Sequence, residues 1–233
     1  MKLGIMQPYF LPYLGYFSLI KHTDKWVVFD TVQYRNRSWI NRNRILSESK
    51  DRTSYITVPV VKQSRDMPIK DTLIDNSQKW REKIYGQISF YKKKAPFFDK
   101  TKAILEEILN CDTNRISLLN TMALKIICEY LNIEFNYSLF SENTMEINSV
   151  NEPDEWALEI SKQMGAKTYI NPPGGKSFFD KKKYDKMGIE LKFLTQTLNP
   201  FNSEFISGLS IIDVMMFNSP EDINKMLDDY ELE

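Results

Sequence analysis

The sequence contains little histidine and little cysteine, which limits its options for metal binding and disulfide bonding. One histidine, His22, and two cysteines, Cys111 and Cys128, occur among 233 residues. Most zinc sites built on several histidine ligands are therefore excluded, and the two cysteines are not spaced like a metal knuckle. We expect two free thiols in a reducing compartment, with Cys128 buried in a helix. A magnesium site on carboxylates stays open, although no spacing points to one.

Long apolar runs and an excess of charge of one sign are also missing. No run of 18 apolar residues occurs, so we expect no transmembrane helix, and the first eight residues lack the apolar stretch of a signal peptide. Lysine plus arginine and aspartate plus glutamate both total 31, so the formal net charge at pH 7 is zero. DNA-binding proteins usually carry a basic excess. The sequence therefore predicts a cytoplasmic protein with no DNA partner and no stable membrane insertion.

The composition that remains is typical of a globular protein, and the expected elements follow the order of an α/β fold. Hydrophobic residues make up 42% of the chain and charged residues 27%. A strand at 3–7, a loop at 8–16, a helix over 16–22 and a strand at 26–29 form a unit of βαβ size. We expect a mixed, mostly parallel, Rossmann-like sheet with a ligand site at the strand ends.

The middle of the chain is expected to be helical. Apolar residues recur every three or four positions after Ser77, after Pro96 and after Thr113. We therefore expect a helical subdomain at about 76–132, inserted in a single domain that spans 1–233. Further strands are expected at 55–61, 133–139, 168–170 and 188–194, and further helices are expected to begin at Pro153, Ser210 and Ser219, with the two serines as N-caps.

The loop after the first expected strand is rich in aromatic and conformationally restricted residues. Gln7 emerges at the strand end, two prolines stiffen the loop, and Gly15 permits close backbone approach. Tyrosine hydroxyls and ring faces can contact a polar substrate. We expect a ligand cradle here, with an aromatic lid over the core as the alternative. The candidate residues are Gln7, as a catalytic side chain, and Tyr9, Tyr13, Gly15 and Tyr16, as substrate-binding residues.

This loop is weakly similar to the loop of nucleotidyltransferases that place a Gly-His pair at a helix start to hold phosphates. Gly15-Tyr16 stands in the place of that pair, and tyrosine donates a hydrogen bond but has no cationic imidazole. A nucleotidyltransferase-like enzyme that uses ATP and magnesium is therefore one alternative. His22, one or two helical turns further on, is a candidate catalytic residue, and a histidine on the helix surface or in the core is the alternative.

The second polar segment, residues 30–44, combines four arginines with amides and aromatic rings and has a single acidic residue, Asp30. Guanidinium groups bind phosphate or carboxylate, and amides suit sugar hydroxyls. Because Asp30 follows an expected strand, it is the candidate general base. A solvated basic loop is the alternative. The candidate substrate-binding residues are the arginines Arg35, Arg37, Arg42 and Arg44, the amides Gln33, Asn41 and Asn43, and the rings of Tyr34 and Trp39.

A third segment, Asn171-Pro172-Pro173-Gly174-Gly175, is expected to form a rigid turn after the strand at 168–170. The backbone N–H groups of Gly174 and Gly175 can bind an oxyanion or phosphate, and the amide of Asn171 can bind a sugar hydroxyl. The alternative is a tight connection with no ligand.

These segments together resemble the WbqC-like protein family, and the chain is identified as a member from them. Gln7-Pro8-Tyr9 and Asn41-Arg42-Asn43 are the most specific of the segments. The resemblance covers nearly the whole chain, with the helices of the middle least distinctive. It runs through residues 6–17, 30–34, 39–45, 169–171, 174–175, 188–194 and 209–214, and Phe140-Ser141-Glu142 stands where the family usually has Ser-Ser-Glu.

The resemblance implies a role in bacterial surface-polysaccharide biosynthesis, because genes of this family lie among those for O-antigen and lipopolysaccharide. It implies a transferase that moves an acyl or aminoacyl group, with glycine proposed, onto a nucleotide-linked or lipid-linked sugar. A carrier-bound glycyl group, a glycyl-tRNA and an adenylate formed in place are all compatible donors, and ATP with magnesium is needed only for the last. The alternative is a non-catalytic scaffold module of a glycan-assembly complex. The oligomeric state is left open.

Overall fold

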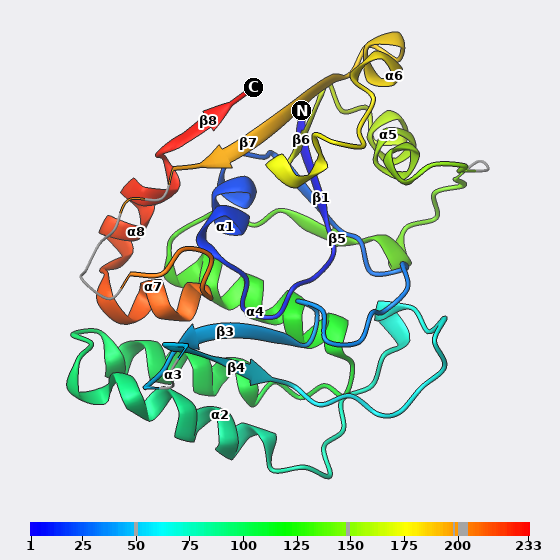
Figure 1. Ribbon diagram of the computed structural model, residues 1–233. Coiled ribbons are helices and arrows are strands. Elements are labelled where there is room, and N and C mark those ends of the chain that lie inside the picture. The colour runs from blue at the N-terminus through cyan, green and yellow to red at the C-terminus, as the bar shows by residue number, and fades with distance from the viewer. Residues whose placement is uncertain (49–50, 148–149, 198, 200–204) are drawn as a thin grey trace.

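Strands from both halves of the chain alternate with helices. The computed structural model describes residues 1–48, 51–147, 150–197, 199 and 205–233. Within these residues, six strands form one sheet in the order β5-β2-β1-β6-β7-β8 (Figure 1). Their bounds are β1 Lys2–Met6, β2 Lys25–Val28, β5 Tyr137–Leu139, β6 Thr168–Asn171, β7 Glu190–Gln196 and β8 Tyr230–Leu232. Neighbouring strands are parallel except β7 and β8, which confirms the mixed, mostly parallel α/β sheet.

Helices cover both faces of this sheet. On one face, α1 (Leu14–Lys21) and α4 (Ile116–Tyr130) share a buried cluster with Trp26 and Val28 of β2. On the other face, α5 (Pro153–Gln163) and α6 (Lys181–Lys186) share a second cluster with Val27. Successive side chains of a strand point to opposite faces, so Trp26 and Val28 belong to one cluster and Val27, between them, belongs to the other. The sheet is therefore the middle of three layers.

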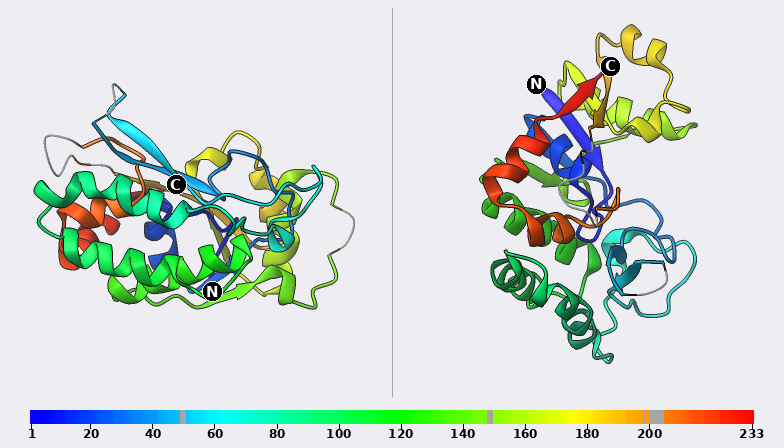
Figure 2. Two further views of the ribbon diagram at one scale, coloured as in Figure 1. Left: turned by 90° about the horizontal axis from the view of Figure 1, so that it is seen from below. Right: turned by 60° about the vertical axis from the view of Figure 1, so that its left-hand side comes forward.

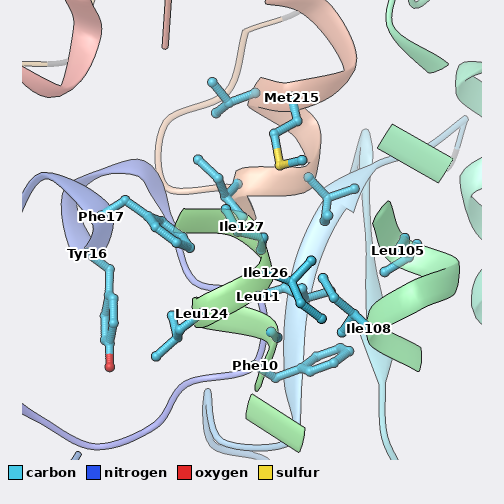
Figure 3. Close-up of a cluster of buried hydrophobic side chains, with 14 of the residues drawn as sticks. Phe10, Leu11, Tyr16, Phe17, Leu105, Ile108, Leu124, Ile126, Ile127 and Met215 are labelled. Atoms are coloured by element: carbon cyan, nitrogen blue, oxygen red, sulfur yellow. The ribbon is translucent and has the colours of Figure 1, made fainter. Parts of the chain in front are cut away.

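The helical segment in the middle of the chain is confirmed. It contains α2 (Trp80–Ile88), α3 (Phe98–Leu109) and α4, and α3 packs on α4 (Figure 2). An antiparallel ribbon of β3 (Arg42–Leu46) and β4 (Thr53–Thr57) lies beside α2. Figure 3 shows how this segment is joined to the sheet: Phe10 and Leu11 of the loop after β1 pack among apolar side chains of α3 and α4.

Several elements differ from the sequence-based expectations. Residues 42–46 form β3, although the segment 30–44 was expected as a ligand-binding loop, and β8 was not expected at all. Only a basic stretch was expected at 181–186, which forms α6 with Asp180 as its N-cap. The two serine caps are confirmed, since the side chains of Ser210 and Ser219 accept backbone N–H groups at the starts of α7 (Ile211–Phe217) and α8 (Pro220–Leu227).

The structure contains two unpaired cysteines. Cys111 and Cys128 are free thiols, and burial raises the pKa of each thiol above its ordinary value. In the part of the chain that the structure describes, no helix combines the length and the apolar character that a bilayer crossing requires.

Candidate functional site

The sheet has a point at which its connections diverge. β1 continues through α1 to β2 on one side, and β6 continues through α6 to β7 on the other side. In open α/β sheets, ligands bind in the crevice at the carboxyl ends of such strands. Gln7 follows β1 directly and Phe29 follows β2, and both line a cleft of about 860 Å³.

The walls of this cleft are aromatic and amide-rich. In the part of the chain that the structure describes, five aromatic side chains line it from four different segments, together with amides and one guanidinium group. The lining residues are Gln7, Tyr9, Phe29, Val32, Gln33, Arg35, Ser38, Trp39, Val150, Asn151, Glu152, Pro153, Trp156 and Phe178. Of the sequence-predicted site residues, the structure thus brings together Gln7, Tyr9, Gln33, Arg35 and Trp39. Trp156 of α5 and Phe178 were not among the candidates, although Trp156 lies in the first turn of the helix expected to begin at Pro153.

The two loops that carry these residues are bonded to each other. The backbone N–H of Phe10 donates to the carbonyl oxygen of Trp39 over 2.8 Å. The buried amide of Asn120, on α4, donates to the carbonyl oxygens of Pro8 (2.8 Å) and Ile40 (2.7 Å). One side chain of the helical segment therefore fixes both loops behind the cleft.

Two asparagines that were predicted to bind substrate act inside the fold. Asn43 is buried and its amide donates to the carbonyl oxygens of Phe10 and Leu11 over 3.1 and 2.8 Å. Asn41 is buried and donates to the carbonyl oxygen of Val58 over 3.0 Å. Neither side chain lines the cleft. Their amides replace the backbone partners that these irregular loops lack.

The tyrosines of the first loop divide between the cleft and the core. Tyr16 is fully buried, and its hydroxyl donates to the carbonyl oxygen of Gln7 over 2.8 Å. Burial, with Tyr9 nearby, raises the pKa of Tyr13 to about 12, and burial also raises the pKa of Tyr9. These phenols are therefore neutral at physiological pH, and Tyr9 is the one of the three that lines the cleft. A Cβ at Gly15 would lie 2.9 Å from the Tyr13 ring, so packing requires this glycine.

The arginines of the second segment do not act together. Arg35 lines the cleft, whereas Arg42 and Arg44 lie on the ribbon. The Cζ atom of Arg42 lies 4.1 Å from the Tyr55 ring centroid, and that of Arg44 lies 5.9 Å from the Trp39 ring centroid. Arg37 is exposed with a left-handed backbone (φ 56°). The remaining ring of this segment, Tyr34, is buried, and burial raises its pKa to about 12 although nearby Arg42 lowers it.

Asp30, the candidate general base, is buried beside the cleft and does not line it. The backbone N–H of Ser141 donates to Oδ1 of Asp30 over 3.0 Å, and the Ser141 hydroxyl donates to Oδ2 over 2.7 Å. Ser141 belongs to a short 3-10 helix at Phe140–Glu142. The carboxylate therefore joins the end of β2 to the segment after β5.

The turn after β6 is held by its own side chains. The hydroxyl of Tyr169 donates to Oδ1 of Asn171 over 2.8 Å, and the Asn171 amide donates to the carbonyl oxygen of Pro172 over 3.1 Å. The N–H of Gly175 also donates to that carbonyl oxygen, over 3.1 Å. Gly174 is exposed. Asn171, Gly174 and Gly175 do not line the cleft themselves, but the turn leads to Phe178, which does.

His22 lies at the other edge of the sheet. α1 runs from the carboxyl end of β1 to the amino end of β2, and His22 follows the last residue of α1. Its Nε2 lies 3.2 Å from Oδ1 of Asp228, and its ring centroid lies 4.2 Å from that of Tyr230. This position separates His22 from the cleft.

Carboxylates are scarce around the cleft. Among its described lining residues the sole acid is Glu152, which caps α5 and lies 2.9 Å from Nζ of Lys183. In the described ranges of the chain, no three His, Cys, Asp or Glu side chains group in a way that could hold a metal ion.

A mostly parallel open sheet with a cleft at the divergence of its connections defines a Rossmann-like α/β protein. Residues 7–225 match the WbqC-like protein family, and the chain belongs to this family. It is 30% identical over 192 residues to the uncharacterized protein Rv1507c of Mycobacterium tuberculosis (strain ATCC 25618 / H37Rv), an alignment that covers 82% of this chain and 80% of the relative. No solved structure matches the chain significantly.

Proposed function

We propose that this protein is a transferase of bacterial surface-polysaccharide biosynthesis, which moves an acyl or aminoacyl group, such as glycyl, onto a carrier-linked sugar. One observation supports this most directly. Gln7 and Tyr9 from one loop and Gln33, Arg35 and Trp39 from another line the same cleft at the strand ends. A binding site formed by separate loops at this edge is the usual arrangement of α/β enzymes.

The chemistry of the lining suits a sugar. Aromatic faces pack on the apolar face of a pyranose ring, and amides bind its hydroxyl groups in defined directions. Tyr9, Trp39 and Trp156 supply such faces, and Gln7 and Gln33 supply the amides. Trp39 is 40% exposed, so a ligand can reach its ring.

In the proposed reaction, an amine or hydroxyl of the sugar attacks the acyl carbonyl of the donor. The attacking group transfers its proton to a base. The tetrahedral oxyanion then expels the group that carried the acyl in the donor, and this leaving group takes up a proton as it departs. Asp30 remains our candidate base. Each of its carboxylate oxygens accepts one hydrogen bond from Ser141 and keeps a second lone pair that can take up a proton. Asp30→Asn should lower turnover by orders of magnitude with little loss of sugar binding, and unchanged turnover would remove Asp30 from this role.

The cleft itself is tested by ligand-induced thermal stabilisation, since a ligand that binds only the folded state raises the unfolding midpoint. The panel contains nucleotide-linked amino sugars, free glycine, and ATP with magnesium. Trp39→Ala should abolish the shift caused by a sugar nucleotide. The matched control is Leu73→Ala, because Leu73 is equally exposed (40%) but does not line the cleft. Equal shifts in both variants would contradict the assignment of the cleft, and a shift with ATP and magnesium alone would favour a nucleotidyltransferase.

A non-catalytic binding module is the second candidate, and the scarcity of free carboxylates favours it. Of the described residues, Asp30, beside the cleft, is engaged by Ser141, and Glu152, in its lining, is engaged by Lys183. Mass spectrometry of the sugar after incubation with a glycyl thioester, with glycyl-tRNA, or with glycine, ATP and magnesium separates the two functions. A gain of one glycyl group supports the transferase, whereas binding without transfer from any of the three donors supports the module.

A further inference from the structure

A second hollow of about 840 Å³ adjoins the cleft. It lies between the loop at 33–36 and the loop at 60–65. Gln33 and Arg35 line both the hollow and the cleft, so the two spaces share a wall. A ligand with two chemically different parts can therefore occupy both.

The hollow is strongly cationic in a protein without net charge. Arg35, Lys62 and Arg65 line it and are exposed, and none of its described lining residues is an aspartate or glutamate. Within the described ranges, none of the three cations has an ion-pair partner. Because like charges repel, an anion placed among them relieves repulsion as well as gaining attraction.

The two loops are held in place without a ligand. The Gln33 amide donates to the carbonyl oxygen of Arg65 over 2.7 Å, and the Tyr34 N–H donates to the carbonyl oxygen of Met67 over 2.8 Å. The cations therefore project from a pre-organised frame, which lowers the entropic cost of binding.

We propose that this hollow binds the diphosphate group of a glycosyl diphosphate, whose sugar lies in the adjoining cleft. The inference rests on the proposed function and specifies its substrate class. Arg35, in the shared wall, contacts the phosphate nearest the sugar, since a guanidinium binds two phosphate oxygens at once. Lys62 and Arg65 bind the second phosphate. Neither of these two was among the candidates from the sequence, where they stand outside the arginine-rich segment.

A diphosphate explains the hollow better than a nucleic acid does. The chain carries no net charge, and the aromatic ring among the described lining residues of the hollow, that of Tyr34, is buried and offers no face on which a base could stack. Nucleoside diphosphate sugars and polyprenyl diphosphate sugars share the diphosphate, so the test must distinguish these two sources.

The test measures affinity by isothermal titration calorimetry with the full chain. The probes are inorganic pyrophosphate, UDP, farnesyl diphosphate and a UDP-linked amino sugar. Lys62→Ala/Arg65→Ala should weaken pyrophosphate binding by at least about tenfold, because two charge-assisted hydrogen-bonding groups are lost. Pyrophosphate affinity should also fall as salt rises, less steeply in this variant. The matched control is Lys92→Ala/Lys93→Ala, which removes the same charge from two exposed lysines of a different hollow.

The outcomes separate this inference from the proposed function. Absence of pyrophosphate binding to the wild-type protein, or an equal loss in both double variants, overturns the inference. Sugar-nucleotide binding that is lost in Trp39→Ala but unchanged in Lys62→Ala/Arg65→Ala supports the cleft as the sugar site and overturns the inference of a diphosphate site. Pyrophosphate binding that depends on Lys62 and Arg65, with no extra affinity for the sugar nucleotide, keeps the anion site and contradicts the function. Tighter binding of UDP or of farnesyl diphosphate than of pyrophosphate identifies the carrier as a nucleoside or a lipid.

Discussion

Asparagine side chains hold the irregular loops of this protein in position. Asn43 and Asn120 each donate to two carbonyl oxygens of loops next to the cleft, and Asn171 is bonded within its own turn. A buried carbonyl without a partner is costly, so these amides are structural requirements. At the scale of residues, the polar side chains near the site therefore divide into those that form the loops and those that face the ligand.

The two glycines of the turn after β6 provide a matched test of this division. A Cβ at Gly175 would overlap the Asn171 amide, which cannot move without breaking its hydrogen bonds, whereas a Cβ at Gly174 would meet nothing within 4 Å. Gly175→Ala should lower the free energy of unfolding by about 1–3 kcal/mol, measured in urea. Gly174→Ala should change it by less than about 0.5 kcal/mol. Equal effects would contradict this account of the turn.

Residue chemistry indicated which loops border the cleft better than which of their side chains line it. Gln7, Tyr9, Gln33, Arg35 and Trp39 were candidates by type and spacing, and all five line the cleft. The sequence could not show which polar side chains face the cleft and which point into the fold. Arg42, Asn43 and Arg44, for example, are all polar and show no alternation with apolar residues. That Asn43 points inward and the arginines do not depends on the pairing of β3 with β4.

At the scale of elements, the first turn of α5 forms one wall of the cleft. Glu152 and Glu155 form a reciprocal capping box, and Pro153 and Trp156 of the same turn line the cleft. Lys183 of α6 lies 2.9 to 3.2 Å from Glu152, Asp154 and Glu155. The position of Trp156 therefore depends on the start of its helix and on a neighbouring helix.

This capping box makes stability depend on pH. The backbone N–H of Asn151 and then the Lys183 ammonium lower the pKa of Glu155 below its ordinary value of 4.5. A lowered folded-state pKa stabilises the protein above the unfolded-state pKa, and this stabilisation is lost as pH falls through the folded-state value. Urea unfolding from neutral pH to about pH 3 should thus show a smaller loss of stability in Glu155→Gln than in wild type. Identical pH profiles would contradict the contribution of this carboxylate.

Elements with strong periodicity were predictable, and short polar elements were not. α2, α3 and α4 show the helical spacing of apolar residues over several turns, and all three were expected. β8 has three residues and α6 has six, mostly lysine, so neither carries enough apolar residues to define a period. Both are stabilised by tertiary contacts, β8 by pairing with β7 and α6 by Tyr184 in the second buried cluster.

At the scale of the whole molecule, the helical segment supports the site from behind. Asn120 of α4 holds the loop after β1 and the loop before β3 through one amide. The same helix contributes Leu124 and Ile127 to the cluster that contains Phe10 and Leu11 (Figure 3). Stability and ligand binding should therefore be coupled through this helix.

Asn120→Leu tests this coupling, because it keeps the volume of the side chain and removes both hydrogen bonds. It should lower the free energy of unfolding by about 2–4 kcal/mol, since the carbonyl oxygens of Pro8 and Ile40 lose their donor. It should also weaken sugar-nucleotide binding, measured by calorimetry on the folded protein. The control is Met122→Leu, at an exposed position of the same helix, which should alter neither quantity. A stability loss with unchanged affinity would confine Asn120 to a role in folding.

The pairing of β1 with β6 also sets the order in which the site can be completed during synthesis. Gly4 pairs with Ile170, so 166 further residues must be translated after Gly4 before β1 gains its second neighbour. At ~5–20 residues per second this interval lasts about 10–30 s. Throughout it, the loop that carries Gln7 and Tyr9 can meet only the partners encoded before residue 168, such as α1, β2 and α4. The crevice at the divergence of the connections is therefore completed late on the ribosome, after the helical segment that supports it has already emerged.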